Sequence, residues 1–130
     1  MSFILGLDVS TSCTGWCVVN QEGTLVDIGS IPLAKYKSVY TKAGEVSNAL
    51  SGIMINHDIE TVYIEENLQS FRRGFSSAQT LSTLARFNGI VSLLAYQQFD
   101  IEPLHINVNS ARKSLGIKII GFTSLLNCLV

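Results

Sequence analysis

The stretch ILGLDVSTSCTGWCVV, residues 4–19, decides the fold class that we predict for this chain. It contains an apolar run that ends at Asp8, a polar turn around Ser10, and a second apolar run that begins near Trp16. Short turns between such runs are typical of antiparallel strands. A third run follows over residues 24–32 after another short turn, so we expect the chain to open with three antiparallel strands.

Helices and strands alternate in the rest of the chain. Apolar residues at spacings of three and four predict a helix over residues 39–56. A β-branched and aromatic run predicts a strand over residues 61–65, and another strand is expected over residues 103–108. Between them, a long helix is predicted that begins near Ser76 and ends at Phe99. The expected buried faces are Ala43, Val46, Leu50, Ile53 and Met54 in the first helix, and Leu81, Leu84, Ala85, Val91, Leu94 and Ala95 in the second.

The order of these elements predicts an α/β domain. Three antiparallel strands followed by helix, strand, helix and strand give a mixed five-stranded sheet with parallel strands in its second half and flanking helices. Asn109 is a suitable N-cap for a further short helix over residues 110–115. This pattern resembles the ribonuclease H-like fold without its C-terminal helix.

Length and composition exclude several classes of protein. A chain of 130 residues forms one domain, and 47% hydrophobic with 15% charged residues excludes disorder. The longest apolar stretch, residues 119–130, is shorter than the roughly 20 residues of a membrane span. The N-terminus has no positive region that would make it a secretory signal. The three cysteines form no C-x-x-C pair, so we expect buried thiols in a reducing cytoplasm.

The charges are distributed unevenly along the chain. Residues 1–66 hold three basic and eight acidic residues, a net charge of −5, whereas residues 67–130 hold six basic and two acidic residues, a net charge of +4. Such a division suits a protein that binds a metal ion in one place and phosphates in another. With 19 charges in total, chance gives the same division about as readily.

Two acidic side chains follow apolar strands directly. Asp8 ends the first strand, and Glu65, with Glu66 beside it, ends the fourth. A carboxylate at such a position is costly to bury unless it is paired or binds a cation, and Mg²⁺ needs few protein ligands. Glu66 points to the other face from Glu65, so Glu66 and Ser10 are expected to support the two ligands. Alternatively, Asp8 caps the polar turn and the two glutamates end an exposed strand.

Three blocks of the sequence resemble RuvC-type Holliday junction resolvases of the ribonuclease H-like superfamily, especially the small phage versions. The first is the stretch at residues 4–19. The second, VYIEENLQSFRRGFSSAQTLSTLARFNGIVSLLAY at residues 62–96, is a strand that ends in Glu, a polar loop and a long helix. The third is VNSARKSLGI at residues 108–117. The resemblance implies a Mg²⁺- or Mn²⁺-dependent endonuclease that cuts four-way junctions or other branched DNA as a homodimer.

The resemblance also implies roles for single residues. Asp8 and Glu65 match the first two catalytic, metal-binding acids of the family. The positions that match DNA-binding residues are Phe71, Arg72, Arg73, Arg112 and Lys113. The alternative explanations of these basic residues are a solvated loop and an exposed helix face, and Phe71 could instead pack against the long helix. The homodimer is expected to use part of that helix, between Ser76 and Phe99, because Arg86 is its one charged residue.

The sequence departs from the family after residue 118. The family carries further catalytic acids on a C-terminal helix, but this sequence has no Asp or Glu after Glu102. We therefore expect a nuclease domain over residues 1–118, a divergent uncharged tail over residues 119–130, and impaired cleavage by what resembles a truncated resolvase.

Two other functions remain open at this point. The first is a branched-DNA-binding module that keeps the fold without catalysis. The second is one domain of a sugar- or acetate-kinase-like ATP-binding protein, since LGLDVSTSCTG loosely resembles the opening of such kinases.

Overall fold

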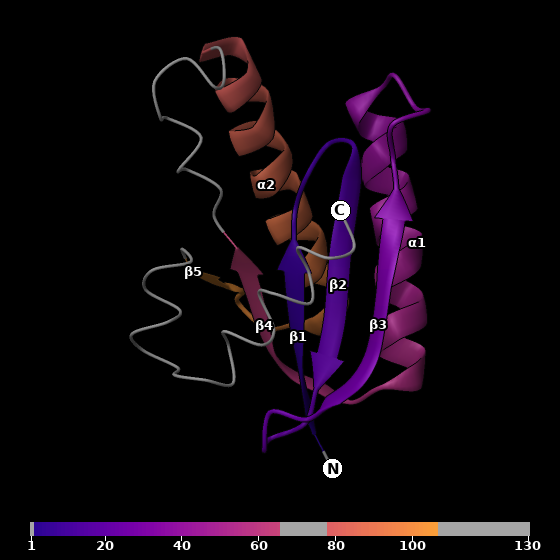
Figure 1. Cartoon of the computed structure of the whole chain (residues 1–130), viewed down its shortest axis with the longest axis vertical. Helices are drawn as coiled ribbons and strands as arrows, with labels where there is room; N and C mark the ends of the chain where they lie inside the picture. Colours follow the sequence, from indigo (N-terminus) through magenta and orange to yellow (C-terminus); the bar gives the residue numbers. More distant parts are fainter. Residues whose placement is uncertain (1, 66–77, 107–130) are drawn as a thin grey trace.

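The computed structural model describes residues 2–65 and 78–106, and its strands form one mixed sheet (Figure 1). The elements are β1 (Phe3–Asp8), β2 (Cys13–Val19), β3 (Leu25–Pro32), α1 (Val39–Asn56), β4 (Ile59–Glu65), α2 (Ala78–Phe99) and β5 (Leu104–Ile106). The strand order is β3-β2-β1-β4-β5. β1, β2 and β3 pair antiparallel, whereas β4 runs parallel to both β1 and β5. The predicted α/β class and mixed five-stranded sheet are confirmed.

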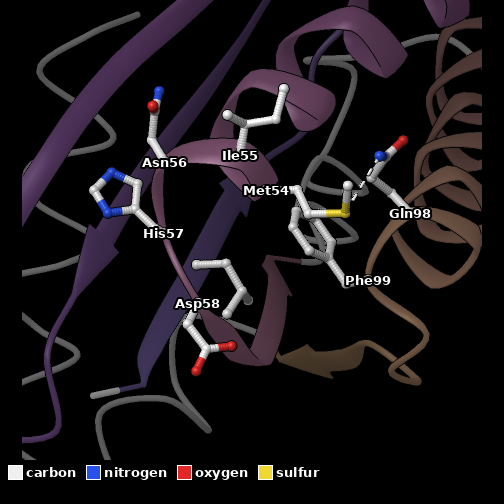
Figure 2. Close-up of a pocket in the computed structure, with 8 residues that line it drawn as sticks. Met54, Ile55, Asn56, His57, Asp58, Gln98 and Phe99 are labelled. Atoms are coloured by element: carbon white, nitrogen blue, oxygen red, sulfur yellow. Dashed lines mark hydrogen bonds between the residues drawn. The ribbon is translucent and has the colours of Figure 1, made fainter.

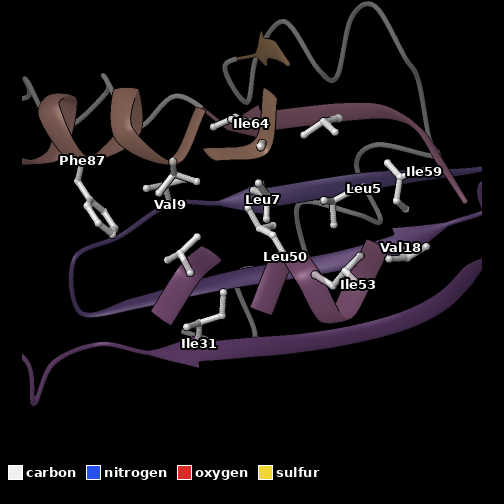
Figure 3. Packing of buried hydrophobic residues seen from close by; sticks show 14 of the residues in the cluster. Leu5, Leu7, Val9, Val18, Ile31, Leu50, Ile53, Ile59, Ile64 and Phe87 are labelled. Atoms are coloured by element: carbon white, nitrogen blue, oxygen red, sulfur yellow. The ribbon is translucent and has the colours of Figure 1, made fainter. Parts of the chain in front are cut away.

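Both helices pack against one face of this sheet (Figure 3). Alternate strand residues point to that face, and Leu5 and Leu7 of β1 are fully buried beneath the helices. The helices contribute Val46, Leu50 and Ile53 from α1, and Phe87, Val91 and Ala95 from α2. On the opposite face, Cys17 and Val19 form a smaller apolar cluster. The sheet therefore has a helix-covered face and an opposite face, and residues next to Leu5 and Leu7 point to the latter.

The bounds of α1 agree with the prediction, and capping residues fix both ends of the helix. Ser38 is the N-cap, and its hydroxyl accepts hydrogen bonds from the backbone N–H groups of Tyr40 and Thr41 at 3.1 and 3.4 Å. His57 is the C-cap. Met54 was expected on the buried face, but 43% of its surface is exposed, because it lies at the edge of the apolar stripe next to Ile53.

The predicted buried stripe of α2 needs one correction. Ala85 is exposed, whereas Phe87, which the prediction omitted, is fully buried. Phe87, Val91 and Ala95 follow one another at intervals of four residues and so share a face. Ala85 lies six residues before Val91, which places it about 120° around the helix from that face.

The strands differ from the predictions only in their bounds. β2 begins at Cys13, three residues before Trp16, so the polar turn between β1 and β2 is tighter than expected. β4 begins at Ile59 rather than at residue 61. The predicted helix over residues 110–115, the domain boundary at residue 118 and the tail over residues 119–130 lie outside the described residues. Neither of the two described helices is long and apolar enough to cross a membrane.

Candidate functional site

Two acidic residues lie side by side where β1 and β4 end. The register of this parallel pair places Asp8 opposite Glu65, and the two arrowheads point to the same end of the sheet (Figure 1). Leu7 and Ile64 point to the helix-covered face, so strand alternation directs the two carboxylates to the opposite face. Their side chains are buried, with 6% and 5% of their surfaces exposed. The structure therefore brings together the two carboxylates that the sequence singled out, and Glu65 does not end an exposed strand.

Glu65 is electrostatically unfavourable as a carboxylate. Its burial, and secondly the nearby charge of Asp8, raise its pKa from 4.5 to about 7. Its Oε2 atom is buried and has no hydrogen-bond partner among the residues that the structure describes. A buried acceptor without a partner costs free energy that a ligand can recover. This combination, a partnerless oxygen beside a second carboxylate, is the environment that a divalent cation stabilises.

Two carboxylates are a small but sufficient set of protein ligands for one class of ion. Within residues 2–65 and 78–106, no group of three or more His, Cys, Asp and Glu side chains could hold a metal ion. Mg²⁺ keeps several of its own waters and is commonly held by one or two carboxylates, whereas a structural Zn²⁺ ion needs four protein ligands. The residues present therefore fit Mg²⁺, or the similar ion Mn²⁺, better than Zn²⁺.

The polar turn that follows Asp8 is held by contacts from three parts of the chain. The buried Thr14 hydroxyl donates a hydrogen bond to the Ser10 carbonyl at 3.0 Å and accepts one from the Ser10 N–H at 3.4 Å. Lys42 Nζ of α1 donates to the Thr11 carbonyl at 2.7 Å. The Ser10 and Ser12 hydroxyls hydrogen bond to each other at 3.0 Å. These contacts fix the backbone directly beyond the carboxylate of Asp8.

Three further residues support this end of the sheet and were not predicted from the sequence. Thr14 and Lys42 hold the turn, and Asn88 Nδ2 of α2 donates to the Glu65 carbonyl at 3.4 Å. Each of these bonds ends on a backbone carbonyl, which any residue type can supply. Lys42 and Thr11 are also 31 positions apart, so no local motif indicates the contact.

Several predicted site residues lie outside the described residues. They are Glu66, Phe71, Arg72, Arg73, Arg112 and Lys113. Their predicted roles in supporting the acids and in binding DNA stay predictions.

A cavity of about 380 Å³ lies at the same end of the sheet as the carboxylates, on the side of α2. The polar turn forms one wall with Ser10 and Thr11, and the first two turns of α2 form the other. The residues from α2 are Gln79, Thr80, Thr83 and Leu84. Among the described residues the lining is thus mostly neutral hydrogen-bonding groups, at the same end of the sheet as the acidic pair.

A second pocket lies at the opposite end of the sheet, where β4 begins (Figure 2). Its wall contains a hydrogen bond from Gln98 Nε2 to Met54 Sδ at 3.5 Å. His57 also lines it, but the His57 Nε2 atom lies 3.0 Å from Asp27 Oδ2 of β3 and so has a structural partner. This pocket therefore shares no residue with the acidic pair.

Comparisons with known proteins point to one family. No family model matches the chain. The crossover junction endodeoxyribonuclease RuvC of Erythrobacter litoralis (strain HTCC2594) is 32% identical over 78 residues, which cover 54% of this chain and 48% of that protein. The chain thus spans about half the length of the curated relative that it matches.

Solved structures show the same likeness in fold. T. thermophilus RuvC in complex with Holliday junction substrate superposes with a TM-score of 0.69 at 13% identity, covering 98% of this chain and 80% of that one. A second Thermus thermophilus RuvC structure gives a TM-score of 0.63 at 16% identity, covering 96% and 80%. The chain is therefore RuvC-like in sequence and has the ribonuclease H-like fold.

Proposed function

From this likeness to RuvC, we propose that the chain is a metal-dependent endonuclease domain. Its reaction is the hydrolysis of phosphodiester bonds in Holliday junctions or other branched DNA, in the cytoplasm of a bacterium or a phage-infected cell. The observation that carries the proposal is the buried pair of Asp8 and Glu65 at the ends of adjacent parallel strands. Such a pair is unfavourable in an isolated protein and becomes favourable when a cation binds between its members.

The proposed cofactor is Mg²⁺ or Mn²⁺. Carboxylate oxygens of Asp8 and Glu65 would hold the ion, and the buried Glu65 Oε2 is the atom that gains a partner. When bound, such an ion lowers the pKa of a water ligand and stabilises the charge on the leaving oxygen of a phosphodiester. The chain contributes two strand ends fixed in register and, through Lys42 and Thr14, a fixed turn beside them.

The raised pKa of Glu65 sets the condition for binding. A carboxyl group binds a cation only after it loses its proton. With a pKa of about 7, Glu65 is deprotonated only in part at neutral pH. We therefore propose that Glu65 exchanges its proton for the cation.

We propose that basic and aromatic residues of the chain bind the DNA. The residues are Phe71, Arg72, Arg73, Arg112 and Lys113. The net charge of +4 over residues 67–130 supports the proposal, because phosphate contacts supply much of the affinity of a nuclease for DNA.

Cleavage by the 130-residue chain alone is proposed to be impaired. Asp8 and Glu65 supply two carboxylates, and the sequence has no Asp or Glu after Glu102. A centre with two metal ions uses more than two carboxylate ligands, because each ion must be held in a fixed place. We therefore expect binding of the ion and of junctions, with slow cleavage.

We also propose a homodimer through α2. Leu93 and Tyr96 lie on one face of this helix and expose 54% and 45% of their surfaces. A second copy of the chain would cover both side chains. If Leu93→Glu lowers the mass measured by light scattering from dimer to monomer, the interface is supported. A wild-type chain that is monomeric at micromolar concentration contradicts it.

The experiment that tests the metal site is thermal melting with and without Mg²⁺ or Mn²⁺. We expect either ion to raise the melting temperature of the wild type but not of Asp8→Asn or Glu65→Gln. Glu22→Gln, which changes an exposed acid in the turn before β3, should respond like the wild type. An equal response in all four proteins would overturn the site.

A labelled four-way junction then tests the activity. Binding with slow, metal-dependent cleavage that is lost in Asp8→Asn supports the proposed nuclease. Binding without any cleavage identifies a non-catalytic junction-binding module instead. If the wild type has no affinity for the junction, the nuclease proposal fails.

A further inference from the structure

Resting on the proposed function, we propose that the cavity between the β1–β2 turn and α2 binds the sugar–phosphate backbone of one DNA strand, beside the acidic pair. The contacting groups are the hydroxyls of Ser10, Thr11 and Thr83 and the amide of Gln79. None of the comparisons assigns a role to this cavity.

The chemistry of the lining points to a sugar–phosphate backbone. Hydroxyl and amide side chains are, after Arg and Lys, the common donors to phosphate and sugar oxygens in protein–DNA complexes. A cavity of about 380 Å³ lies within the range of small-ligand sites, roughly 300–1,000 Å³. The six lining residues in the described part of the chain carry no charge. Neutral donors can hold an anionic strand close to Asp8 and Glu65 without forming ion pairs with the two carboxylates.

The position of the cavity suits a strand that crosses this end of the sheet. The carboxylates point to the face opposite the helices, whereas the cavity lies on the side of α2. Val9, which follows Asp8 directly, belongs to the same buried cluster as Phe87 of α2, so the two walls are joined by the core (Figure 3). We expect a strand that crosses this end of the sheet, with one phosphate at the carboxylates, to place neighbouring nucleotides at the cavity.

One wall is held by hydrogen bonds before any ligand binds, and the other is the start of a regular helix. The turn is fixed by Thr14 and by the 2.7 Å bond from Lys42 Nζ to the Thr11 carbonyl. On the helix, Gln79 and Thr83 are four positions apart and therefore share a face. Donors whose backbone is already fixed lose little conformational freedom on binding. The Lys42 ammonium also places a positive charge behind the turn, which favours an anionic ligand.

The test measures the affinity for a synthetic four-way junction, with Ca²⁺ in place of Mg²⁺ so that bound DNA stays intact. Thr83→Val removes one hydroxyl while keeping the shape of the side chain, and Gln79→Ala removes the amide. Each is expected to weaken binding about three- to tenfold, the usual value of a neutral hydrogen bond. Thr83→Ser should bind like the wild type. Gln97→Ala, an exposed glutamine near the other end of α2, is the matched control.

The salt dependence of binding separates this site from the basic residues. A neutral donor releases no counterion, so Thr83→Val should leave the slope of log K against log salt unchanged, whereas loss of a phosphate-binding Arg lowers that slope by about one. Wild-type binding with unchanged affinity in Thr83→Val and Gln79→Ala would overturn the cavity site but leave the nuclease proposal standing. A wild type without affinity for the junction would overturn both. The cavity site would also be overturned if Thr83→Val and Gln79→Ala weakened binding and also lowered the slope of log K against log salt by about as much as the loss of an Arg does.

Discussion

Asp8 lies directly opposite Glu65 across the parallel pair of β1 and β4, and both side chains are buried. Two carboxylates at such a place cannot both ionise without a cost, because each is deprived of water and repels the other. The conflict is visible in the pKa of Glu65, which burial and the Asp8 charge raise to about 7. The domain therefore carries a local instability that a proton, a neutral substitution or a cation can each relieve.

The neutral substitution Glu65→Gln should stabilise the metal-free protein. At about pH 8 it removes a buried charge beside Asp8. We therefore expect the free energy of unfolding to rise by about 1–3 kcal/mol, which is somewhat less than the free energy that corresponds to the pKa shift of Glu65. Urea unfolding in a chelating buffer measures the change. Glu22→Gln should leave stability unchanged, since Glu22 is exposed. A loss of stability in Glu65→Gln would contradict the view that the buried charge of Glu65 destabilises the metal-free protein.

The stability of the metal-free wild type should fall as the pH rises from about 4.5 to about 7. In this window the folded protein, with the pKa of Glu65 at about 7, binds a proton that the unfolded chain, with its ordinary value of 4.5, has already lost. The unfolded state therefore binds fewer protons, which makes the slope of stability against pH negative. Glu65→Gln should lack this part of the slope. Parallel pH profiles for the two proteins would show that Glu65 has an ordinary pKa.

Binding of the cation should be coupled to the loss of a proton. Below about pH 7 the ion displaces a proton from Glu65, so the rise in melting temperature on adding Mg²⁺ should be small near pH 6 and larger near pH 8. Calorimetry in two buffers of different ionisation enthalpy measures the released protons directly. A thermal shift that is equal at both pH values would mean that Glu65 does not bind the ion.

The fold followed from the sequence because its signals are local. The apolar runs before Asp8 and Glu65, the turns between the first three strands and the helical spacing over residues 39–56 each indicate an element without reference to the others. The pairing of Asp8 with Glu65 also followed, because the ends of adjacent parallel strands meet at one end of a sheet. The resemblance to RuvC then agreed with this arrangement.

The details that could not be predicted depend on contacts between distant parts of the chain. Lys42 donates to a carbonyl 31 positions earlier, and no periodicity marks such a bond. The cavity beside the acidic pair likewise exists only because the turn at Ser10 and Thr11 is folded against α2. In α2 itself, Phe87 was missed since several apolar residues around it allow more than one stripe, and only packing against Val9 and its neighbours selects one.

The close approach of Trp16 and Gly29 in paired strands gives the last prediction. The two residues are partners in the pairing of β2 with β3, and a Cβ atom at position 29 would lie only 2.5 Å from Cζ2 of the Trp16 ring. The ring is packed against the main core, so it cannot move aside freely. Gly29→Ala should therefore lower the free energy of unfolding by about 1–3 kcal/mol, as overpacking does.

Three further variants decide whether this contact is the cause. Gly44→Ala in α1, where an added Cβ meets nothing within 4 Å, should instead be neutral or raise stability by up to about 1 kcal/mol. Trp16→Phe removes the ring atoms that an alanine at position 29 would strike, so the double variant should lose less stability than the sum of the two single changes. Urea unfolding of the wild type, Gly29→Ala, Trp16→Phe and the double variant measures this coupling. Additive losses would show that Gly29 is required for a reason other than the indole ring.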